Sequence, residues 1–215
     1  MNKTFEFRTQ YIIPVLLGIK ARNLEELRSS IRTVPDASIY YHTHRFLKQH
    51  ITLVPEPPND FAYWVRTALN MKKFAEKLAS INIVACNNLG ELRNKILSVF
   101  DVGDSKDIFF HKCLKGDEFH FMSCKTICLS TGHKSKNTKE FLDVLQKIDF
   151  NPFFFHMFAA KLRYGKKYND FSQWLFDIGE DTAAEKLNSI DPYNMTLEKL
   201  RIHIIQIITG YAKNR

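Results

Sequence analysis

The hydrophobic and polar positions of this chain form two similar series, one in each half. Each series opens with apolar residues that alternate with polar ones, as a half-buried strand requires, at Phe5-Glu6-Phe7 and at Phe119-His120-Phe121. Runs with apolar residues at helical spacing follow. The most regular run begins at Asn59 and is apolar at i, i+3, i+4 and i+7, and its counterpart begins at Asn169. The pattern predicts a small sheet and several short amphipathic helices in each half.

The two series can be aligned, which indicates a tandem duplication. A shift of 114 residues matches Phe5 with Phe119, Phe7 with Phe121, Gly18 with Gly132, Asn23 with Asn137, Glu26 with Glu140, Tyr41 with Phe155, and His42 with His156. After a loop that is four residues shorter in the second half, Asn59-Asp60-Phe61 and Trp64 fall on Asn169-Asp170-Phe171 and Trp174. We therefore predict a first repeat over residues 1–107 and a second repeat over residues 118–215. Residues 108–117 are predicted to supply the strand and turn of a hairpin that links them.

Helix starts can be assigned from capping residues. Asn23 and Asn137 are predicted N-caps of the first helix, and Glu26 and Glu140 lie three residues on, where a carboxylate can reach back to the cap amide. The second helix is predicted after Pro35 and at Asn151-Pro152, with His42 and His156 on its apolar face. The third starts at Asn59-Asp60 and Asn169-Asp170. A short fourth helix contains Phe74 and Leu78, and a fifth is capped by Asn88 and ends the chain in its second copy.

These elements predict a fold that is mainly α with a minor β component (α+β). We expect two helical bundles, related by a pseudo-twofold axis and packed together with a small sheet or hairpin. A composition of 45% hydrophobic and 13% aromatic residues supplies an aromatic-rich core for each repeat.

The net charge of +8 is typical of a nucleic-acid-binding protein only when it is concentrated. Here the excess is +4 in residues 1–107 and +4 in residues 108–215. The densest basic stretch, residues 133–139, contains no acidic residue and is interpreted as a solvated loop entering a helix, with a phosphate or nucleic-acid contact as the alternative.

The sequence pattern favours neither an exported protein nor a metal-binding one. The apolar run from Tyr11 to Gly18 is matched by residues 125–132, so it belongs to the fold and is not a secretory signal, and no apolar stretch approaches the roughly 20 residues of a membrane span. We expect a cytoplasmic protein without membrane contact, with reduced cysteines. A zinc site made of His111, Cys113, Cys124 and Cys128 is the alternative to free thiols, but no Cys-x2-Cys pair supports it, and we predict no cofactor and no metal.

Two stretches of the sequence are distinctive. They are Ser38-Ile39-Tyr40-Tyr41-His42-Thr43-His44-Arg45-Phe46-Leu47 and Pro55-Glu56-Pro57-Pro58-Asn59-Asp60-Phe61-Ala62-Tyr63-Trp64-Val65. With residues 119–122 and Asn169-Asp170-Phe171, they are similar to a prokaryotic family known as a domain of unknown function. The resemblance covers nearly the whole chain. It implies no established activity, and it implies a link to carbohydrate metabolism only because such proteins are often encoded beside glycosyltransferases.

The polar constellation that occurs in both repeats is the candidate site. It consists of His42, Asn59, Asp60 and Trp64 in the first repeat and His156, Asn169, Asp170 and Trp174 in the second, and His44 is an added candidate of the first. In a structural interpretation Asn caps the third helix, Trp fills the core, and the histidine donates a hydrogen bond to the carboxylate. In a catalytic interpretation the His–Asp pair is an oriented general base, although no activated nucleophile accompanies it. We expect both histidines to be buried and bonded within their own repeat.

Two further features of the sequence are candidates for a surface that binds a partner. The loop Pro55-Glu56-Pro57-Pro58 occurs only in the first repeat and predicts a rigid turn, with a docking surface as the alternative. Tyr40, Tyr41 and Tyr63 suit a sugar-stacking or partner-binding patch if they are exposed, and the core if they are not. Since no nucleotide, hydrolase or metalloprotease motif is present, the sequence favours a non-catalytic binding, regulatory or scaffold module with a protein or glycan partner. The alternatives are an unrecognised enzyme with a His/Asp site between the repeats and a nucleic-acid-binding protein.

Overall fold

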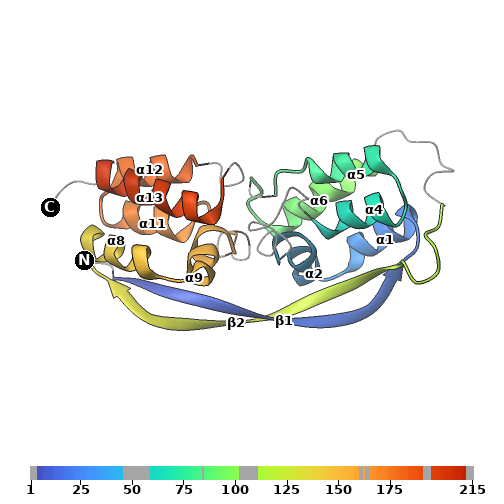
Figure 1. Ribbon diagram of the computed structural model, residues 1–215, viewed down its shortest axis with the longest axis horizontal. Coiled ribbons are helices and arrows are strands. Elements are labelled where there is room, and N and C mark those ends of the chain that lie inside the picture. The colour runs from blue at the N-terminus through green and yellow to red at the C-terminus, as the bar shows by residue number, and fades with distance from the viewer. Residues whose placement is uncertain are drawn as a thin grey trace. The chain divides into compact units, whose positions relative to one another are not determined.

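The computed structural model describes residues 4–45, 59–83, 85–101, 111–159, 162, 165–190 and 195–211. Over these residues the fold is α+β, mainly helical, with two antiparallel strands in one sheet (Figure 1). The predicted class, mainly α with a minor β component, is confirmed. In the described part of the chain no helix has the length and apolar character needed to cross a membrane.

The two strands are much longer than the sequence predicted. β1 covers Phe5–Ala21 and β2 covers Phe119–Ser135, and each has 17 residues. The apolar run from Tyr11 to Gly18 therefore continues the strand that begins at Phe5. β2 pairs with β1 and not with the strand predicted before it, since residues 111–114 lie outside any strand. The tight turn is present at Lys115-Gly116, where Gly116 has a φ of 102°, and residues 108–110 of the predicted hairpin lie outside the described residues.

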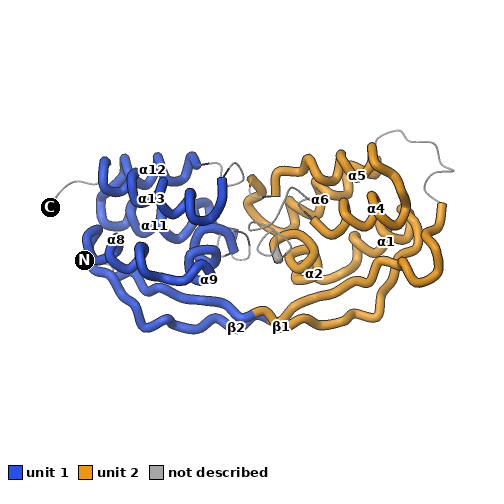
Figure 2. Tube along the Cα trace, in the orientation of Figure 1, with its two compact units in different colours: residues 1–11, 126–215 blue, residues 12–125 orange. Residues whose placement is uncertain are grey.

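The chain forms two compact units, shown in different colours in Figure 2. Unit 1 consists of residues 1–11 and 126–215, and unit 2 consists of residues 12–125. Unit 2 therefore contains the helices of the first predicted repeat together with the beginning of β2. Unit 1 contains the helices of the second predicted repeat together with the beginning of β1. In each unit the helices lie over one side of the strands (Figure 1).

The helices of unit 2 follow the predicted order. They are α1 (Leu24–Thr33), α2 (Asp36–Tyr40), the π-helical turn η1 (Tyr41–Arg45), α4 (Asp60–Thr67), α5 (Lys72–Ala79) and α6 (Leu89–Val99). Asn23, Asn59 and Asn88 are the N-caps of α1, α4 and α6, and each side chain accepts a backbone N–H bond from three residues on.

The helices of unit 1 occur in the same order. They are α8 (Thr138–Lys147), α9 (Phe150–Phe154), the π-helical turn η2 (Phe155–Ala159), α11 (Asp170–Asp177), α12 (Asp181–Asn188) and α13 (Leu197–Tyr211). Asn137 and Asn169 are the N-caps of α8 and α11, as predicted. α9 starts at Phe150, one residue before the predicted start.

The glutamates predicted to complete the caps do so by a different bond. Glu26 Oε2 accepts from the backbone N–H of Arg22 at 2.8 Å, and Glu140 Oε2 accepts from that of Lys136 at 2.8 Å. Both amides belong to the residue before the cap, so the carboxylate reaches one residue further back than a standard capping box. It still holds the chain as it leaves the strand and enters the helix.

The second helix departs from the prediction where it meets the histidines. The sequence predicted one amphipathic helix with His42 on its apolar face in the first repeat and His156 in the second, but the α-helix gives way to a π-helical turn at Tyr41, and again at Phe155. The described side chains of both turns are buried, from Tyr41 to His44 and from Phe155 to Ala159. Such π-turns are uncommon and often occur at functional sites. Residues 46–50, which follow the first turn, and residues 160–161, which follow the second, lie outside the described residues.

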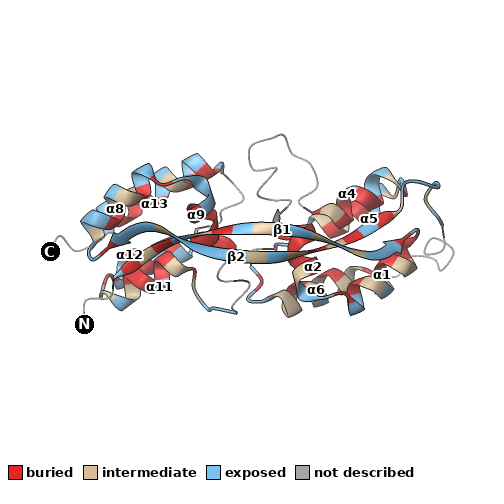
Figure 3. Cartoon of the chain, turned by 90° about the horizontal axis from the view of Figure 1, so that it is seen from below, coloured by how far each residue is buried: buried red, intermediate tan, exposed pale blue. Residues whose placement is uncertain are grey.

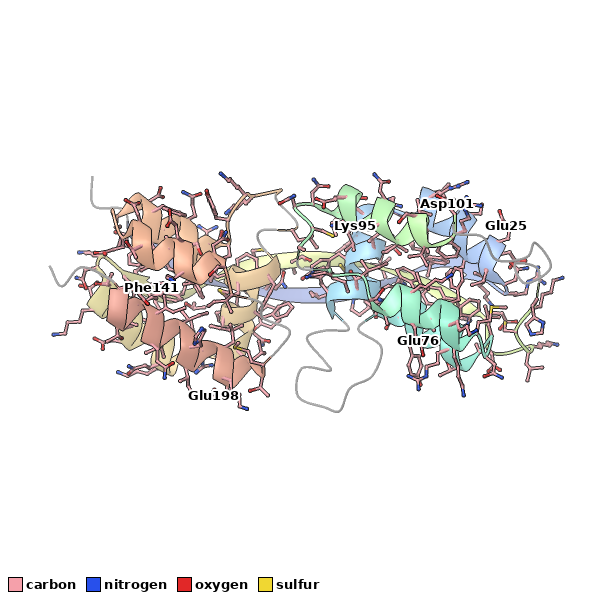
Figure 4. All side chains as sticks on the ribbon, turned by 90° about the horizontal axis from the view of Figure 1, so that it is seen from above. Glu25, Glu76, Lys95, Asp101, Phe141 and Glu198 are labelled. Carbon is pink, nitrogen blue, oxygen red and sulfur yellow. The ribbon has the colours of Figure 1, made fainter. Side chains whose placement is uncertain are left out.

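The core of each unit is apolar and aromatic, and Figure 3 shows buried residues gathered on the inner sides of the helices. Phe7, Phe141 and Phe171 in unit 1 and Leu27 and Phe61 in unit 2 are fully buried. Figure 4 shows Phe141 inside unit 1, whereas the charged side chains of Glu76 and Glu198 point away from their helices into solvent. The hydrophobic faces predicted from helical spacing therefore form these cores.

Candidate functional site

His42 connects the start of α4 to the start of β2. Its Nδ1 lies 2.7 Å from Oδ2 of Asp60, the first residue of α4, and its Nε2 accepts a hydrogen bond of 2.9 Å from the backbone N–H of Met122. The histidine side chain is 3% exposed. Both ring nitrogens therefore have partners, one from the helices and one from the strand.

His156 makes the same two bonds in unit 1. Its Nδ1 lies 2.8 Å from Oδ2 of Asp170, the first residue of α11, and its Nε2 accepts a 2.8 Å hydrogen bond from the backbone N–H of Arg8. Asp170 has an additional partner, because Nζ of Lys166 lies 2.6 Å from its Oδ1. The expectation that both histidines are buried is confirmed. The expectation that each is bonded within its own repeat is right for the aspartates and wrong for the strand amides, which come from the other repeat.

The strand amides fix the tautomer of both histidines. A backbone N–H can only donate, so Nε2 of His42 and of His156 must carry a lone pair, and the ring proton lies on Nδ1, where it is donated to the aspartate. The rings are therefore neutral. Burial lowers the pKa of His156 below its usual value, against the opposing effect of Asp170. Burial alone would raise the pKa of Asp170, but the hydrogen bonds from His156 and Lys166 outweigh it and the pKa is lowered.

The ring of each histidine belongs to an aromatic cluster that holds the Phe-x-Phe segment of a strand. In unit 2 the segment is Phe119-His120-Phe121, and the cluster, called the socket of unit 2, consists of His42, Phe61 and Trp64. In unit 1 the segment is Phe5-Glu6-Phe7, and the socket of unit 1 consists of His156, Phe171 and Trp174. Phe141 also contacts Phe5 and Phe7, with ring centroids 5.3 Å apart in both cases.

The asparagines and tryptophans of the candidate site have structural partners. Asn59 caps α4 through Ala62 and donates to the backbone oxygen of Leu78 at 3.1 Å, while Asn169 caps α11 and donates to the hydroxyl of Ser172 at 3.0 Å. Trp64 Nε1 donates to the backbone oxygen of Asp117 at 2.6 Å, just before β2 begins. The predicted capping and core roles of these residues agree with this geometry.

His44 is separate from the His42 constellation. Its side chain is buried, its ring stacks on Tyr40 with centroids 5.5 Å apart, and its Nδ1 lies 3.0 Å from the hydroxyl of Thr43. Burial lowers the pKa of His44 to about 3. In unit 1 the matched pair is Phe154 and Phe158, with centroids 5.0 Å apart. His44 thus occupies a position where the other unit has an apolar ring.

A pocket of about 590 Å³ opens beside His156 in unit 1. It is lined by three aromatic side chains (Phe5, Phe155 and Trp174), by His156, and by Thr4, Glu6, Arg8, Cys128, Lys166, Asp170, Gln173 and Asp177. Many of its polar side chains are paired with one another. Glu6 binds Arg8, Lys166 binds Asp170, and Gln173 Nε2 donates to Oδ1 of Asp177 at 3.2 Å. The walls therefore present preformed donors and acceptors at the edge of an aromatic cluster.

The sequence singled out His156, Asp170 and Trp174 but not the other polar residues of this pocket. The sequence signal that could have identified these pocket residues was a difference between the two repeats. Gln173 and Asp177 align with Tyr63 and Thr67, so this helix has an amide and a carboxylate four residues apart on its exposed face in the second repeat alone. No sequence pattern connected them to Arg8, which is more than 150 residues away.

The structure does not bring the remaining candidate residues together into a site. Tyr40 and Tyr41 are buried and so do not form an exposed patch, whereas Tyr63 is 44% exposed. His111, Cys113, Cys124 and Cys128 do not form a zinc site, since no group of three or more His, Cys, Asp or Glu side chains is placed to hold a metal ion within the described ranges. The four cysteines form no disulfide within the part of the chain that the structure describes. The loop over residues 55–58 lies outside the described residues.

The chain belongs to a family described as a family of unknown function (DUF5752), whose model matches residues 2–209. The chain is also similar to a solved structure, OrfY from Thermoproteus tenax, with a TM-score of 0.84 and 28% sequence identity over 97% of this chain and 95% of that one. No curated protein matches the chain. The predicted resemblance to a family of unknown function is confirmed.

Proposed function

We propose that this protein is a non-catalytic binding or regulatory module that holds a small, uncharged polyhydroxylated ligand of the carbohydrate class in the pocket of unit 1. The observation that carries the proposal is the pocket itself. Its volume of about 590 Å³ lies within the range of small-molecule sites, which is about 300–1,000 Å³. Its lining combines aromatic side chains with several polar groups, which is the composition expected of a small-molecule site.

The charges of the pocket favour a neutral ligand. Arg8 and Lys166 each lie against a carboxylate, Glu6 and Asp170 respectively, so neither cation presents an uncompensated charge to an anion. The hydrogen bond from Arg8 lowers the pKa of Glu6, so this carboxylate stays ionised and accepting. Hydroxyl groups both donate and accept, so they fit a wall that contains carboxylate and amide acceptors as well as donor side chains. This ligand class agrees with the carbohydrate link that the family resemblance implies.

The histidines weigh against the catalytic alternative. A general base needs a free lone pair within reach of a substrate proton. The Nε2 lone pairs of His42 and His156 already accept strand amides, and their Nδ1 protons are already donated to Asp60 and Asp170. Both rings are buried, so proton transfer would require one of these bonds to break.

Titration of the ¹⁵N-labelled full-length chain with a panel of mono- and disaccharides tests the proposal. We expect saturable shifts of the Gln173 side-chain amide and the Trp174 indole with at least one sugar, and weaker binding after Gln173→Ala or Asp177→Ala. Tyr63→Ala and Thr67→Ala are matched controls at the aligned positions of α4, and they should leave the affinity unchanged. If no sugar shifts these signals, or if the control variants weaken binding equally, the proposal is wrong.

A further inference from the structure

The segment that fills each socket comes from a distant part of the chain. In unit 1 the bond between Arg8 and His156 spans 148 residues, and in unit 2 the bond between Met122 and His42 spans 80 residues. The segment in unit 1 continues through β1 into unit 2, and the segment in unit 2 continues through β2 into unit 1. Each segment is thus held by helices that belong to the other predicted repeat.

The two segments make matching contacts with the histidine, phenylalanine and tryptophan of their sockets, and the segment of unit 1 also contacts Phe141. The first phenylalanine lies 4.9 Å from His156 in unit 1 and 4.8 Å from His42 in unit 2, between ring centroids. The same ring lies 5.7 Å from the tryptophan in both units.

The second phenylalanine ring also makes matching contacts in the two units. It lies 6.1 Å from His156 in unit 1 and 5.9 Å from His42 in unit 2, in an edge-on arrangement in both. The distances to Phe171 and Phe61 are 6.2 Å and 6.4 Å. In both units the backbone N–H of the residue after the second phenylalanine donates to the histidine.

Recognition in these contacts depends on the two phenylalanine rings and on one main-chain N–H. The residue between the rings differs in chemistry, Glu6 in one segment and His120 in the other, as does the residue after them, Arg8 or Met122. The two segments therefore meet the recognition requirements of both sockets. A segment that enters a socket from another chain forms the same contacts as one that enters within the chain, and exchange of identical elements is a low-cost route to dimers.

We infer that the sockets of both units also accept the Phe-x-Phe segment of a second copy of this chain, so that two chains can associate by exchanging the beginnings of β1 or β2. The partner surface is the socket, and the occupant is residues 4–8 or 118–122 of the second chain. This association requires no ligand, although Phe5 and Arg8 of the segment and His156 and Trp174 of the socket also line the pocket of unit 1.

A labelled peptide of residues 4–11 is the probe. Full-length protein carrying Phe5→Ala and Phe7→Ala, with its socket in unit 1 emptied, should bind the peptide saturably, and an unlabelled peptide of residues 118–125 should displace it. A control peptide with alanine at both phenylalanine positions should bind at least about a hundredfold more weakly, since two buried rings are lost. A folded variant that does not bind the peptide, or that binds the control equally, overturns the inference.

The unmodified chain gives a second measurement that does not depend on the folding of the variant. We expect wild-type protein refolded from urea at high protein concentration to form dimers, detected by native mass spectrometry. Adding the residue 4–11 peptide during refolding should suppress these dimers, and the alanine control peptide should not. Absence of dimers, or dimers that the peptide does not suppress, overturns the inference.

Discussion

The backbone N–H of Met122 donates a hydrogen bond to Nε2 of His42 over 2.9 Å, although the two residues are 80 positions apart. Through Nδ1 the same ring is bonded to Asp60 at the start of α4. One buried side chain thus fixes the position of a strand relative to a helix start, and His156 does the same with Arg8 and Asp170. The histidines are best understood as clamps between strand and helix.

The first prediction concerns the loss of either clamp. His42→Ala removes two hydrogen bonds and leaves a cavity among aromatic rings, so we expect the free energy of unfolding to fall by about 2–3 kcal/mol. His156→Ala should cause a similar loss because its contacts are the same. Urea unfolding of both variants checks this. Unchanged stability of His42→Ala, combined with a loss of ligand binding, would contradict the structural role.

The second prediction is a difference in stability between variants of the two capping asparagines, Asn59 and Asn169. Asn59→Asp keeps the acceptor for Ala62 but loses the donor to the backbone oxygen of Leu78. Asn169→Asp loses only a bond to the Ser172 hydroxyl, which can rotate. Asn59→Asp should therefore lower the free energy of unfolding by about 1 kcal/mol more than Asn169→Asp does. Equal losses in thermal or urea unfolding would show that the bond to Leu78 contributes nothing.

The helix caps and the burial of the two histidines could be predicted from the sequence. Asn23, Asn59, Asn88, Asn137 and Asn169 were predictable as caps, because a cap acts within three residues of its own position. The burial of His42 and His156 was also predictable, because each lies on an apolar stripe.

The strand partners of the histidines were not predictable. A strand amide is supplied by the backbone, so Met122 and Arg8 carry no side-chain signal for this bond. The length of β1 was missed because Tyr11, Ile13 and Leu16 are exposed apolar residues, and this breaks the alternation expected of a half-buried strand. The polar residues of the pocket were missed because they meet only when the beginning of β1 reaches α11.

The third prediction is a pH dependence of stability. Folding lowers the pKa of His44 from 6.5 to about 3, so below pH 6.5 the unfolded chain binds a proton that the folded chain does not. The free energy of unfolding is therefore highest above about pH 6.5 and falls as the pH approaches 3, by up to about 1.4 kcal/mol per pH unit for this group. The lowered pKa of His156 acts in the same direction.

His44→Phe isolates this effect, because Phe158 occupies the matched position of unit 1. The variant should lose part of the slope between pH 6.5 and 3 and should gain stability relative to wild type as the pH falls. His133→Gln, which removes an exposed histidine, is the control and should leave the slope unchanged. An identical slope for His44→Phe and wild type in urea titrations would contradict the assignment.

The fourth prediction concerns Trp64. Trp64→Phe keeps an aromatic ring against Phe119 but removes the donor to the backbone oxygen of Asp117. We expect a loss of about 1 kcal/mol and faster tryptic cleavage after Lys115, because the turn before β2 loses its attachment to α4. If the cleavage rate after Lys115 stays at the wild-type value, this bond does not hold the turn.

The tautomeric state of His42 and His156 tests the clamp most directly, and ¹⁵N NMR of the full-length chain at pH 7 measures it. The account predicts neutral rings protonated at Nδ1, with an unprotonated Nε2 that shows scalar coupling across the hydrogen bond to the amide of Met122 or Arg8. A ring protonated at Nε2, or a charged imidazolium at this pH, would contradict it, because neither state can accept the strand amide.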